Sequence, residues 1–214
     1  MPEKTPPATV LIPAYNEEGT VADVVRVAVE AGFPVVVADD GSHDATALRA
    51  REAGAEVVEL RPNRGKGGAY AAGLERVKTP YVILLDADLT GLRPEHLHEL
   101  LEPVLRGEAD MTVGVFRGGR WLSDFGNRIT PQLSGQRALA ADKLRGLPDL
   151  ANSRYDVELK LTRHARRQGW RVRYLPLVGV GQKLKEEKRG FWAGLTHRLR
   201  MYAQILRYAL KPRA

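Results

Sequence analysis

Two carboxylates, Asp86 and Asp88, follow an apolar run with one residue between them, and this spacing is the strongest chemical signal in the chain. The run, residues 81–85, is typical of a strand that is buried on both faces. Two carboxylates that point to one place repel each other unless a cation lies between them. Mg²⁺ and Mn²⁺ prefer oxygen ligands and often bind one or two carboxylates together with substrate phosphates. The pair therefore indicates a site for a divalent metal and a diphosphate, although Asp is also common in surface turns.

Three further polar segments lie beside apolar runs in the same half of the chain. Residues 13–17 and 39–42 follow predicted strands, whereas the glycine-rich loop 63–68 precedes a predicted helix. In a sheet of parallel strands, ligands bind beyond the carboxyl ends of the strands. We therefore expect these segments to converge with residues 86–90, and loop 63–68 must fold over to join them.

The elements that position these loops alternate between strand and helix patterns. This alternation is typical of an α/β fold with a mostly parallel central sheet flanked by helices. The predicted strands are 8–12, 35–38, 56–60, 81–85 and 110–116, and the predicted helices are 18–31, 45–53, 69–77, 94–105 and 155–168. Further along, the sequence predicts two short strands around Pro176 (172–175 and 178–180), a charged link at 181–189, and a segment at 134–139 that is too polar for the core.

The composition is that of a globular protein. A chain of 214 residues is long enough to bury one good core, so we expect a single domain over residues 1–214. Without cysteine there is no disulfide, no thiol nucleophile and no cysteine-ligated zinc. The first eight residues lack the apolar core of a signal peptide, and no apolar run approaches the ~20 residues of a membrane span. We therefore expect a cytoplasmic location.

The charge is distributed unevenly along the chain. Residues 1–150 carry 17 basic and 22 acidic side chains, a formal charge of −5, whereas residues 151–214 carry 16 and 4, a formal charge of +12. A basic C-terminal third suggests an anionic partner such as a phosphate, a membrane surface or a nucleic acid. No recognisable RNA- or DNA-binding motif is present, so we expect no nucleic-acid partner. A non-catalytic nucleic-acid- or anion-binding protein is nevertheless the alternative from another class.

Four motifs in this order and spacing resemble the family 2 glycosyltransferases with the GT-A fold. They lie at residues 12–17, 37–42, 63–67 and 85–89, and the resemblance is firm over residues 8–140. The chain is most similar in character to small bacterial polyprenyl-phosphate hexosyltransferases and glucosyl-phosphoglycerate synthases. The resemblance implies a Rossmann-like GT-A fold and metal-dependent transfer of a hexose, with inversion, from a UDP- or GDP-sugar. It also implies that the acceptor is a lipid phosphate or a small phosphorylated molecule.

The resemblance implies a role for each residue that matches a motif. The nucleoside pocket would have Tyr15 against the base and Glu17 near the ribose, and Asp40 would hydrogen-bond the base. Packing alone is the alternative for Tyr15, and a turn is the alternative for Asp40. The full implied set is Pro13, Ala14, Tyr15, Glu17 and Asp40 for the nucleoside, Lys66 near the base or phosphates, and Asp86, Ala87 and Asp88 for the ribose and for the Mg²⁺ or Mn²⁺ that bridges the diphosphate.

Three residues outside these motifs are candidates for acceptor chemistry. Asp156 and Glu158 lie at the start of a predicted helix, where either could be the base that deprotonates a sugar hydroxyl. Each could equally be a favourable charge at a helix N-terminus. A phosphate acceptor is already ionised and needs no base. Arg137 could grip an acceptor phosphate with two hydrogen bonds, or it could form a surface ion pair.

The chain departs from the lipid-phosphate members in ways that leave the acceptor open. Thr90 stands where those members commonly carry Gln, and the C-terminal membrane helices that they often carry are not seen in this sequence. His164 and His197 could serve as a late metal ligand, but both lie in predicted helices, where packing is the simpler interpretation.

The final predicted helix, residues 190–210, is basic and amphipathic. It could lie on an anionic membrane at the inner face, or pack its apolar stripe on the domain, which we favour. The resemblance divides the remainder into a nucleotide-sugar-binding half, 8–110, and an acceptor-side half, 111–180. The enzymatic alternative is a sugar-phosphate nucleotidyltransferase. It would carry a glycine-rich loop with Arg directly after the first strand, where this chain has residues 13–17.

Overall fold

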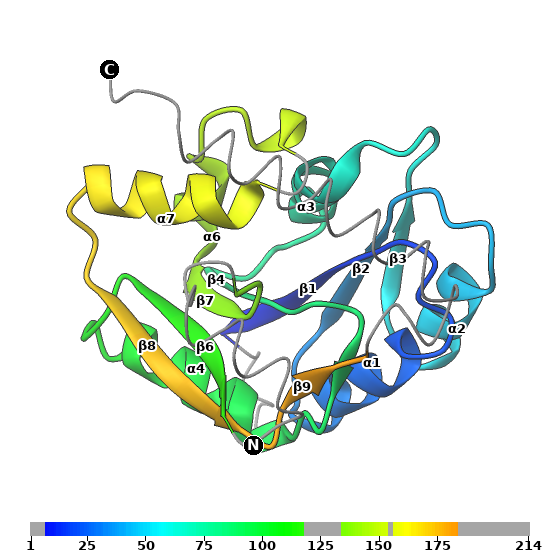
Figure 1. The fold of residues 1–214 in the computed structure, drawn as a ribbon, viewed down its shortest axis with the longest axis horizontal. Helices are drawn as coiled ribbons and strands as arrows, with labels where there is room; N and C mark the ends of the chain where they lie inside the picture. Colours follow the sequence, from blue (N-terminus) through cyan, green and yellow to red (C-terminus); the bar gives the residue numbers. More distant parts are fainter. Residues whose placement is uncertain (1–6, 118–133, 154–155, 184–214) are drawn as a thin grey trace, which may run out of the picture.

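The computed structural model describes residues 7–117, 134–153 and 156–183, and is built around one twisted sheet (Figure 1). The sheet has seven strands in the order β3-β2-β1-β4-β7-β6-β8, and β5 and β9 form a separate two-stranded sheet. Strands β1 to β4 pair in parallel. The strands are β1 (Ala8–Ala14), β2 (Val35–Asp39), β3 (Glu56–Glu59), β4 (Tyr81–Leu84), β5 (Leu89–Thr90), β6 (Met111–Arg117), β7 (Arg137–Ala140), β8 (Val172–Val178) and β9 (Gly181–Gln182).

Helices cover both faces of the large sheet (Figure 1). Strand β4 shows why, because Ile83 packs into the core on one face while Val82 and Leu84 pack into the core on the other. The first face carries α1 (Val21–Glu30), α2 (Thr46–Glu52) and α4 (Pro94–Leu105), and the second carries α3 (Gly65–Leu74), α6 (Ala141–Arg145), the 3₁₀ helix η2 (Leu150–Asn152) and α7 (Val157–Arg167).

Strand direction in the second half of the chain decides which residues reach the ligand edge of the sheet. Strand β7 lies between β4 and β6 and runs antiparallel to both, so its first residue, Arg137, pairs with Leu84 at the carboxyl end of β4. Strand β8 runs parallel to β6, and the chain continues from it into β9, which pairs with β5. The segments just before β7 and just after β8 therefore both arrive beside residues 86–90.

The structure confirms the α/β fold and most of the predicted elements. Helix α4 has the predicted bounds, and the strands of the first half agree within two residues at each end. The prediction of a glycine-rich loop at 63–68 is partly wrong, because α3 begins at Gly65 and not at Ala69. Gly65 has φ of +81°, a left-handed conformation that glycine adopts without strain, so the chain turns there and enters the helix at once.

Three expectations for the second half are wrong. Residues 134–139 are not outside the core: Ser134, Gln136 and Arg137 are all at most 4% exposed, and β7 starts within this segment. Their polar groups are accommodated because they hydrogen-bond each other and also Gly114 in β6 and Thr162 in α7.

The region around Pro176 is one strand, β8, and not two. It lies at the edge of the sheet, where a proline that lacks an N–H does not interrupt a ladder. The predicted charged link at 181–189 begins instead with the short strand β9.

The predicted helix at 190–210 lies outside the described residues. Among the helices in the described ranges, none is both long and apolar enough to cross a membrane.

Candidate active site

The carboxylate of Asp86 is the centre of a polar cluster at the carboxyl end of β4. Its Oδ1 accepts a hydrogen bond from Lys66 Nζ at 2.6 Å, and its Oδ2 accepts from Gln136 Nε2 at 2.8 Å and from Gln182 Nε2 at 2.9 Å. Lys66 Nζ also forms an ion pair with Glu158 Oε1. The side chains of Asp86, Lys66 and Glu158 are 16%, 22% and 11% exposed, so the cluster is sheltered but reaches the surface. The structure thus brings together three of the predicted site residues.

Lys66 is held charged by its two acidic neighbours. Burial alone would lower the pKa of Lys66, but Asp86 and Glu158 favour the ammonium and raise its pKa well above the ordinary value. Because its side chain is still 22% exposed, a charged Lys66 is suited to binding an anionic ligand.

Asp40 places Lys66 by capping the first turn of α3. Its Oδ1 accepts the backbone N–H of Arg64 at 2.6 Å, and its Oδ2 accepts that of Gly65 at 2.8 Å. Asp40 is only 5% exposed. A carboxylate at a helix N-terminus is favourable because it satisfies backbone donors and the helix dipole. In this structure Asp40 therefore orients the helix that carries Lys66, and its predicted contact with a nucleobase stays a prediction.

Hydrogen bonds join the loop that follows β1 to the segment that follows β2. Asn16 N donates to Ser42 Oγ at 2.9 Å, and Glu17 N donates to Thr46 Oγ1 at 2.7 Å. Within this pair of loops Tyr15 is 42% exposed, as a side chain that stacks on a ligand requires, whereas Glu17 is 6% exposed and accepts a hydrogen bond from Thr20 Oγ1. The implied nucleoside residues thus lie along one edge, with Pro13 and Ala14 inside the β1–β2 ladder.

Asp88 and Ala87 lie between β4 and β5. Ala87 is 4% exposed and its side chain packs in the hydrophobic core. Asp88 is partly exposed, and its backbone O accepts the N–H of Lys183 at 3.0 Å. The chain just after β9 is therefore hydrogen-bonded to this loop.

The donor set fits a divalent cation that shares its shell with a ligand. In the described ranges no three His, Cys, Asp or Glu side chains cluster as a complete metal site. Mg²⁺ commonly takes one or two carboxylates and completes its shell with phosphate and water, so Asp88, with Asp86 beside it, is a suitable protein contribution.

The structure places the remaining candidates differently. Arg137 is buried at 1% exposure, so the surface ion pair is wrong. Its Nε donates to Ser134 O at 2.9 Å and its Nη1 to Thr162 Oγ1 at 3.0 Å, and burial lowers its pKa. Its predicted contact with an acceptor phosphate stays a prediction. Asp156 precedes α7 and pairs with Lys160 at 3.3 Å, whereas Glu158 joins the Lys66 cluster.

The residues that sequence reasoning missed are Gln136, Gln182 and Gly135. A Cβ on Gly135 would lie 2.6 Å from Asp86 Oδ1, so only glycine lets this segment approach the carboxylate. The antiparallel β7 and the β5–β9 pair bring these residues to the site. Nothing in the local sequence marks Gln182, whereas the polar stretch 134–137 is a signal whose composition alone predicts an exposed segment.

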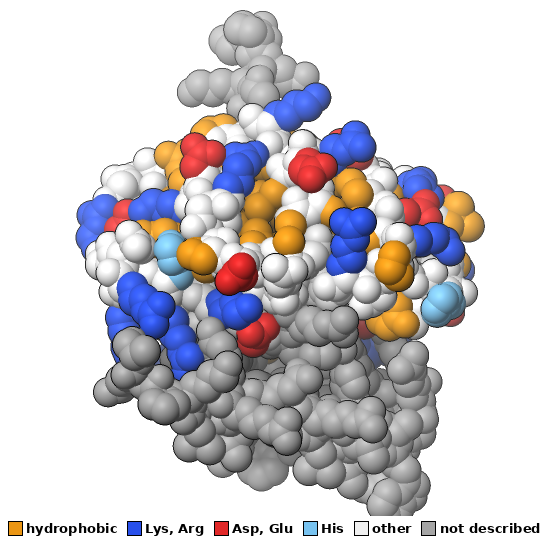
Figure 2. All heavy atoms as spheres, turned by 90° about the horizontal axis from the view of Figure 1, so that it is seen from above, with side chains coloured by type: hydrophobic (Ala, Val, Ile, Leu, Met, Phe, Trp, Pro, Cys, Tyr) orange, Lys and Arg blue, Asp and Glu red, His pale blue; other side chains and the backbone are white. Residues whose placement is uncertain are grey.

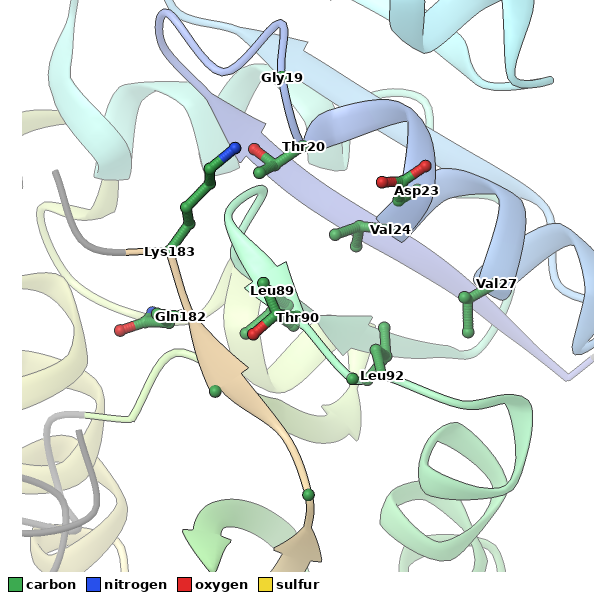
Figure 3. Close-up of a pocket in the computed structure, with 13 residues that line it drawn as sticks. Gly19, Thr20, Asp23, Val24, Val27, Leu89, Thr90, Leu92, Gln182 and Lys183 are labelled. Carbon is green, nitrogen blue, oxygen red and sulfur yellow. The ribbon is translucent and has the colours of Figure 1, made fainter. Parts of the chain in front are cut away.

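A groove of about 590 Å³ adjoins the cluster, between α1 and the β5–β9 sheet (Figure 3). Val24, Val27 and Leu92 form its apolar wall, and Thr20 and Lys183 lie at one end. Seen from above, the described part of the molecular surface carries Lys and Arg interspersed with Asp and Glu, and not a continuous basic face (Figure 2). That face offers no support for the nucleic-acid alternative.

Taken together, the parallel sheet, the Asp-Ala-Asp turn at its carboxyl edge and the lysine beside it define a GT-A-type enzyme. The sequence agrees: residues 9–174 match the model of "Glycosyl transferase family 2". The chain belongs to this family and is a glycosyltransferase.

Its relatives include an uncharacterized protein and several named glycosyltransferases. The chain is 30% identical over 198 residues to the uncharacterized protein MJ1222 of Methanocaldococcus jannaschii, covering 80% of both chains. It is 34% identical over 139 residues to the undecaprenyl-phosphate 4-deoxy-4-formamido-L-arabinose transferase of Edwardsiella ictaluri, covering 59% of this chain and 42% of the other. For seven curated relatives, including that transferase, the chain spans only 20% to 63% of their length.

The fold is similar to that of glucosyl-3-phosphoglycerate synthase from Mycobacterium tuberculosis. The crystal structure of that enzyme with Mn²⁺, UDP-glucose and phosphoglyceric acid superposes with a TM-score of 0.68 and 27% identity, covering 82% of this chain and 71% of that one. Another crystal structure of the enzyme contains Mg²⁺ and UDP.

Proposed function

We propose that this protein is a metal-dependent hexosyltransferase. It takes a hexose from a UDP- or GDP-sugar and transfers it, with inversion, to a phosphate-bearing acceptor. The observation that carries the proposal is the Asp86 cluster, in which a charged lysine and two carboxylates meet at the carboxyl edge of a parallel sheet. The comparisons support it, because a structural neighbour binds UDP-glucose with Mn²⁺ and a phosphorylated acceptor.

Donor binding uses residues 8–110 in this proposal. Tyr15 stacks on the base, and Pro13, Ala14, Glu17 and Asp40 line the nucleoside pocket. Lys66 neutralises the diphosphate, and Asp88 with Asp86 holds Mg²⁺ or Mn²⁺. When bound, the metal offsets the charge that the nucleoside diphosphate gains as it leaves.

The acceptor binds on the side formed by residues 111–180. Its shared chemistry is a phosphate, carried either by a polyprenyl lipid, as in the name of the Edwardsiella ictaluri relative, or by a small molecule such as the phosphoglyceric acid of the neighbour. Arg137 is too enclosed to reach it without a rearrangement, so we assign it to the support of α7. If the acceptor is a sugar hydroxyl, Glu158 is the better-placed base, because it lies within the Lys66 cluster.

A thermal-shift panel tests the donor. UDP, GDP and their hexoses are titrated with and without Mn²⁺, because a ligand that binds only the native state raises its melting temperature. One nucleotide should raise the melting temperature only with Mn²⁺ present. If neither UDP nor GDP does so, the proposal is wrong. Incubation of the active donor with polyprenyl phosphate and with 3-phosphoglycerate then distinguishes the acceptors, and NMR of the product determines inversion.

Location is a separate part of the proposal. We propose a cytoplasmic protein in which residues 190–210 pack their apolar stripe on the domain, with contact to an anionic membrane as the alternative. Co-sedimentation with anionic and with neutral vesicles, for the full chain and for a form that ends at residue 189, tests the contact. Equal sedimentation of the two forms with anionic vesicles contradicts it.

A further inference from the structure

The carboxylate of Asp86 accepts hydrogen bonds from two glutamines that lie far apart in the sequence. Gln136, before β7, and Gln182, in β9, both donate from Nε2 to the same oxygen, Oδ2, at 2.8 and 2.9 Å. Lys66 takes the other oxygen, Oδ1. Hydrogen bonds to an ionised acceptor are about twice as strong as neutral ones, so these contacts fix the direction of the carboxylate.

Each glutamine is itself held in place. Gln136 is 1% exposed, and Ser134 Oγ lies 2.8 Å from its Oε1. The one hydroxyl hydrogen of Ser134 has two acceptors within reach, Gln136 Oε1 and the backbone O of Gly114, while Gln136 Nε2 faces the Asp86 carboxylate, which can only accept.

Gln182 is fixed by the β5–β9 pair, in which it lies opposite Leu89. A Cβ on Gly91 would lie 2.2 Å from Gly179 O, so the two segments approach as closely as glycine permits. In Figure 3 the Gln182 side chain extends from β9 on the side away from α1, while Lys183 extends toward Thr20.

Resting on the proposed function, we infer that Gln136 and Gln182 are positioning residues for donor binding. They hold the Asp86 carboxylate aimed at Lys66, and as neutral donors they orient it without cancelling its charge. A divalent cation that binds Asp88 would then meet an Asp86 carboxylate that is already oriented. Strand β9 couples the part of the chain after β8 directly to this arrangement, through Gln182 to Asp86 and through the Lys183 N–H to Asp88 O.

A double-mutant cycle without any ligand tests the contact itself. The melting temperatures of Gln182→Leu, Asp86→Asn and the double variant are compared with wild type. If Gln182 acts on Asp86, the shift of the double variant differs from the sum of the single shifts. The matched control is Gln168→Leu, an exposed glutamine after α7, whose shift should add to that of Asp86→Asn. Additive shifts for Gln182 overturn the inference.

Calorimetric titration of UDP and GDP with Mn²⁺ tests the consequence, at a temperature where every variant is folded. Gln182→Leu should weaken nucleotide binding about tenfold, the equivalent of one charge-assisted hydrogen bond partly lost. Gln168→Leu should bind like wild type. A Gln182→Leu protein with wild-type affinity overturns the positioning role, because a merely structural residue would change the melting temperature alone. If wild type itself binds neither nucleotide, the proposed function fails, and the ligand-free cycle still decides whether Gln182 holds Asp86.

Discussion

Replacing Gly135 by alanine should disable the Asp86 cluster while leaving the fold intact. The new Cβ would lie 2.6 Å from Asp86 Oδ1, 2.7 Å from Oδ2 and 2.8 Å from Cγ. Carbon–oxygen contacts are ordinarily about 3.5 Å, so the carboxylate must move by roughly 0.8 Å. Its present hydrogen bonds are 2.6 to 2.9 Å long. A displacement of that size takes one or two of them beyond hydrogen-bond range.

The expected loss of donor affinity follows from those bonds. A hydrogen bond to a charged group contributes about 1.5–3 kcal/mol, and 1.4 kcal/mol is a factor of ten. Loss of one such bond therefore weakens binding of UDP or GDP in the presence of Mn²⁺ by about tenfold to a hundredfold, as measured by calorimetry. The control is Gly146→Ala, after α6, where φ is −76° and the nearest atom to a new Cβ is 3.3 Å away. If Gly135→Ala binds as tightly as Gly146→Ala, Asp86 does not need its present position and the reasoning is refuted.

Three other predictions concern charge and packing. Lys66→Met should weaken nucleotide diphosphate binding about tenfold or more in the same titration, because it removes the cation beside Asp86; an unchanged affinity would contradict this. Lys143 and Arg171 hold the pKa of Asp110 at about 2, below its ordinary value of 3.8. At pH values above 3.8 this shift contributes up to about 2 kcal/mol to the free energy of unfolding, and the contribution is lost as the pH falls toward 2. Asp110→Asn should therefore lower the free energy of unfolding at pH 7, but not near pH 2, in urea titrations at both values; equal losses would refute it. Gly67→Ala should lower the melting temperature by several degrees, because its Cβ would lie 2.2 Å from the backbone O of Leu150; a wild-type melting curve would count against this close contact.

The first half of the fold could be predicted from sequence because its signals are local. A short apolar run such as residues 81–85 is typical of a strand buried on both faces of a parallel sheet, so it can be recognised without knowledge of the fold. Pro94 likewise marks the first turn of α4, because proline is favoured at helix starts. The order of strands and loops then places Asp40, Lys66 and Asp86 at one edge without any knowledge of packing.

The second half could not be predicted in the same way because its signals are not local. Arg137 and Gln136 have the composition of a surface loop, yet the reversed direction of β7 buries them beside Leu84, where the surrounding polar groups satisfy them. The pairing of Gln182 with Leu89 depends on the register of two strands 92 residues apart in the sequence, each only two residues long. Local sequence patterns therefore do not predict the contact between β5 and β9.

The central claim is that Asp88 supports metal-dependent binding of a sugar nucleotide. The most direct measurement is a calorimetric titration of UDP and GDP into wild type, Asp88→Asn and Asp142→Asn, each with and without Mn²⁺. Asp142 is a suitable control because its side chain is 94% exposed on α6, away from the cluster. We expect Mn²⁺-dependent binding of one nucleotide to wild type and to Asp142→Asn, and loss of that binding in Asp88→Asn. Binding of the same strength and the same Mn²⁺ dependence in Asp88→Asn would contradict the claim.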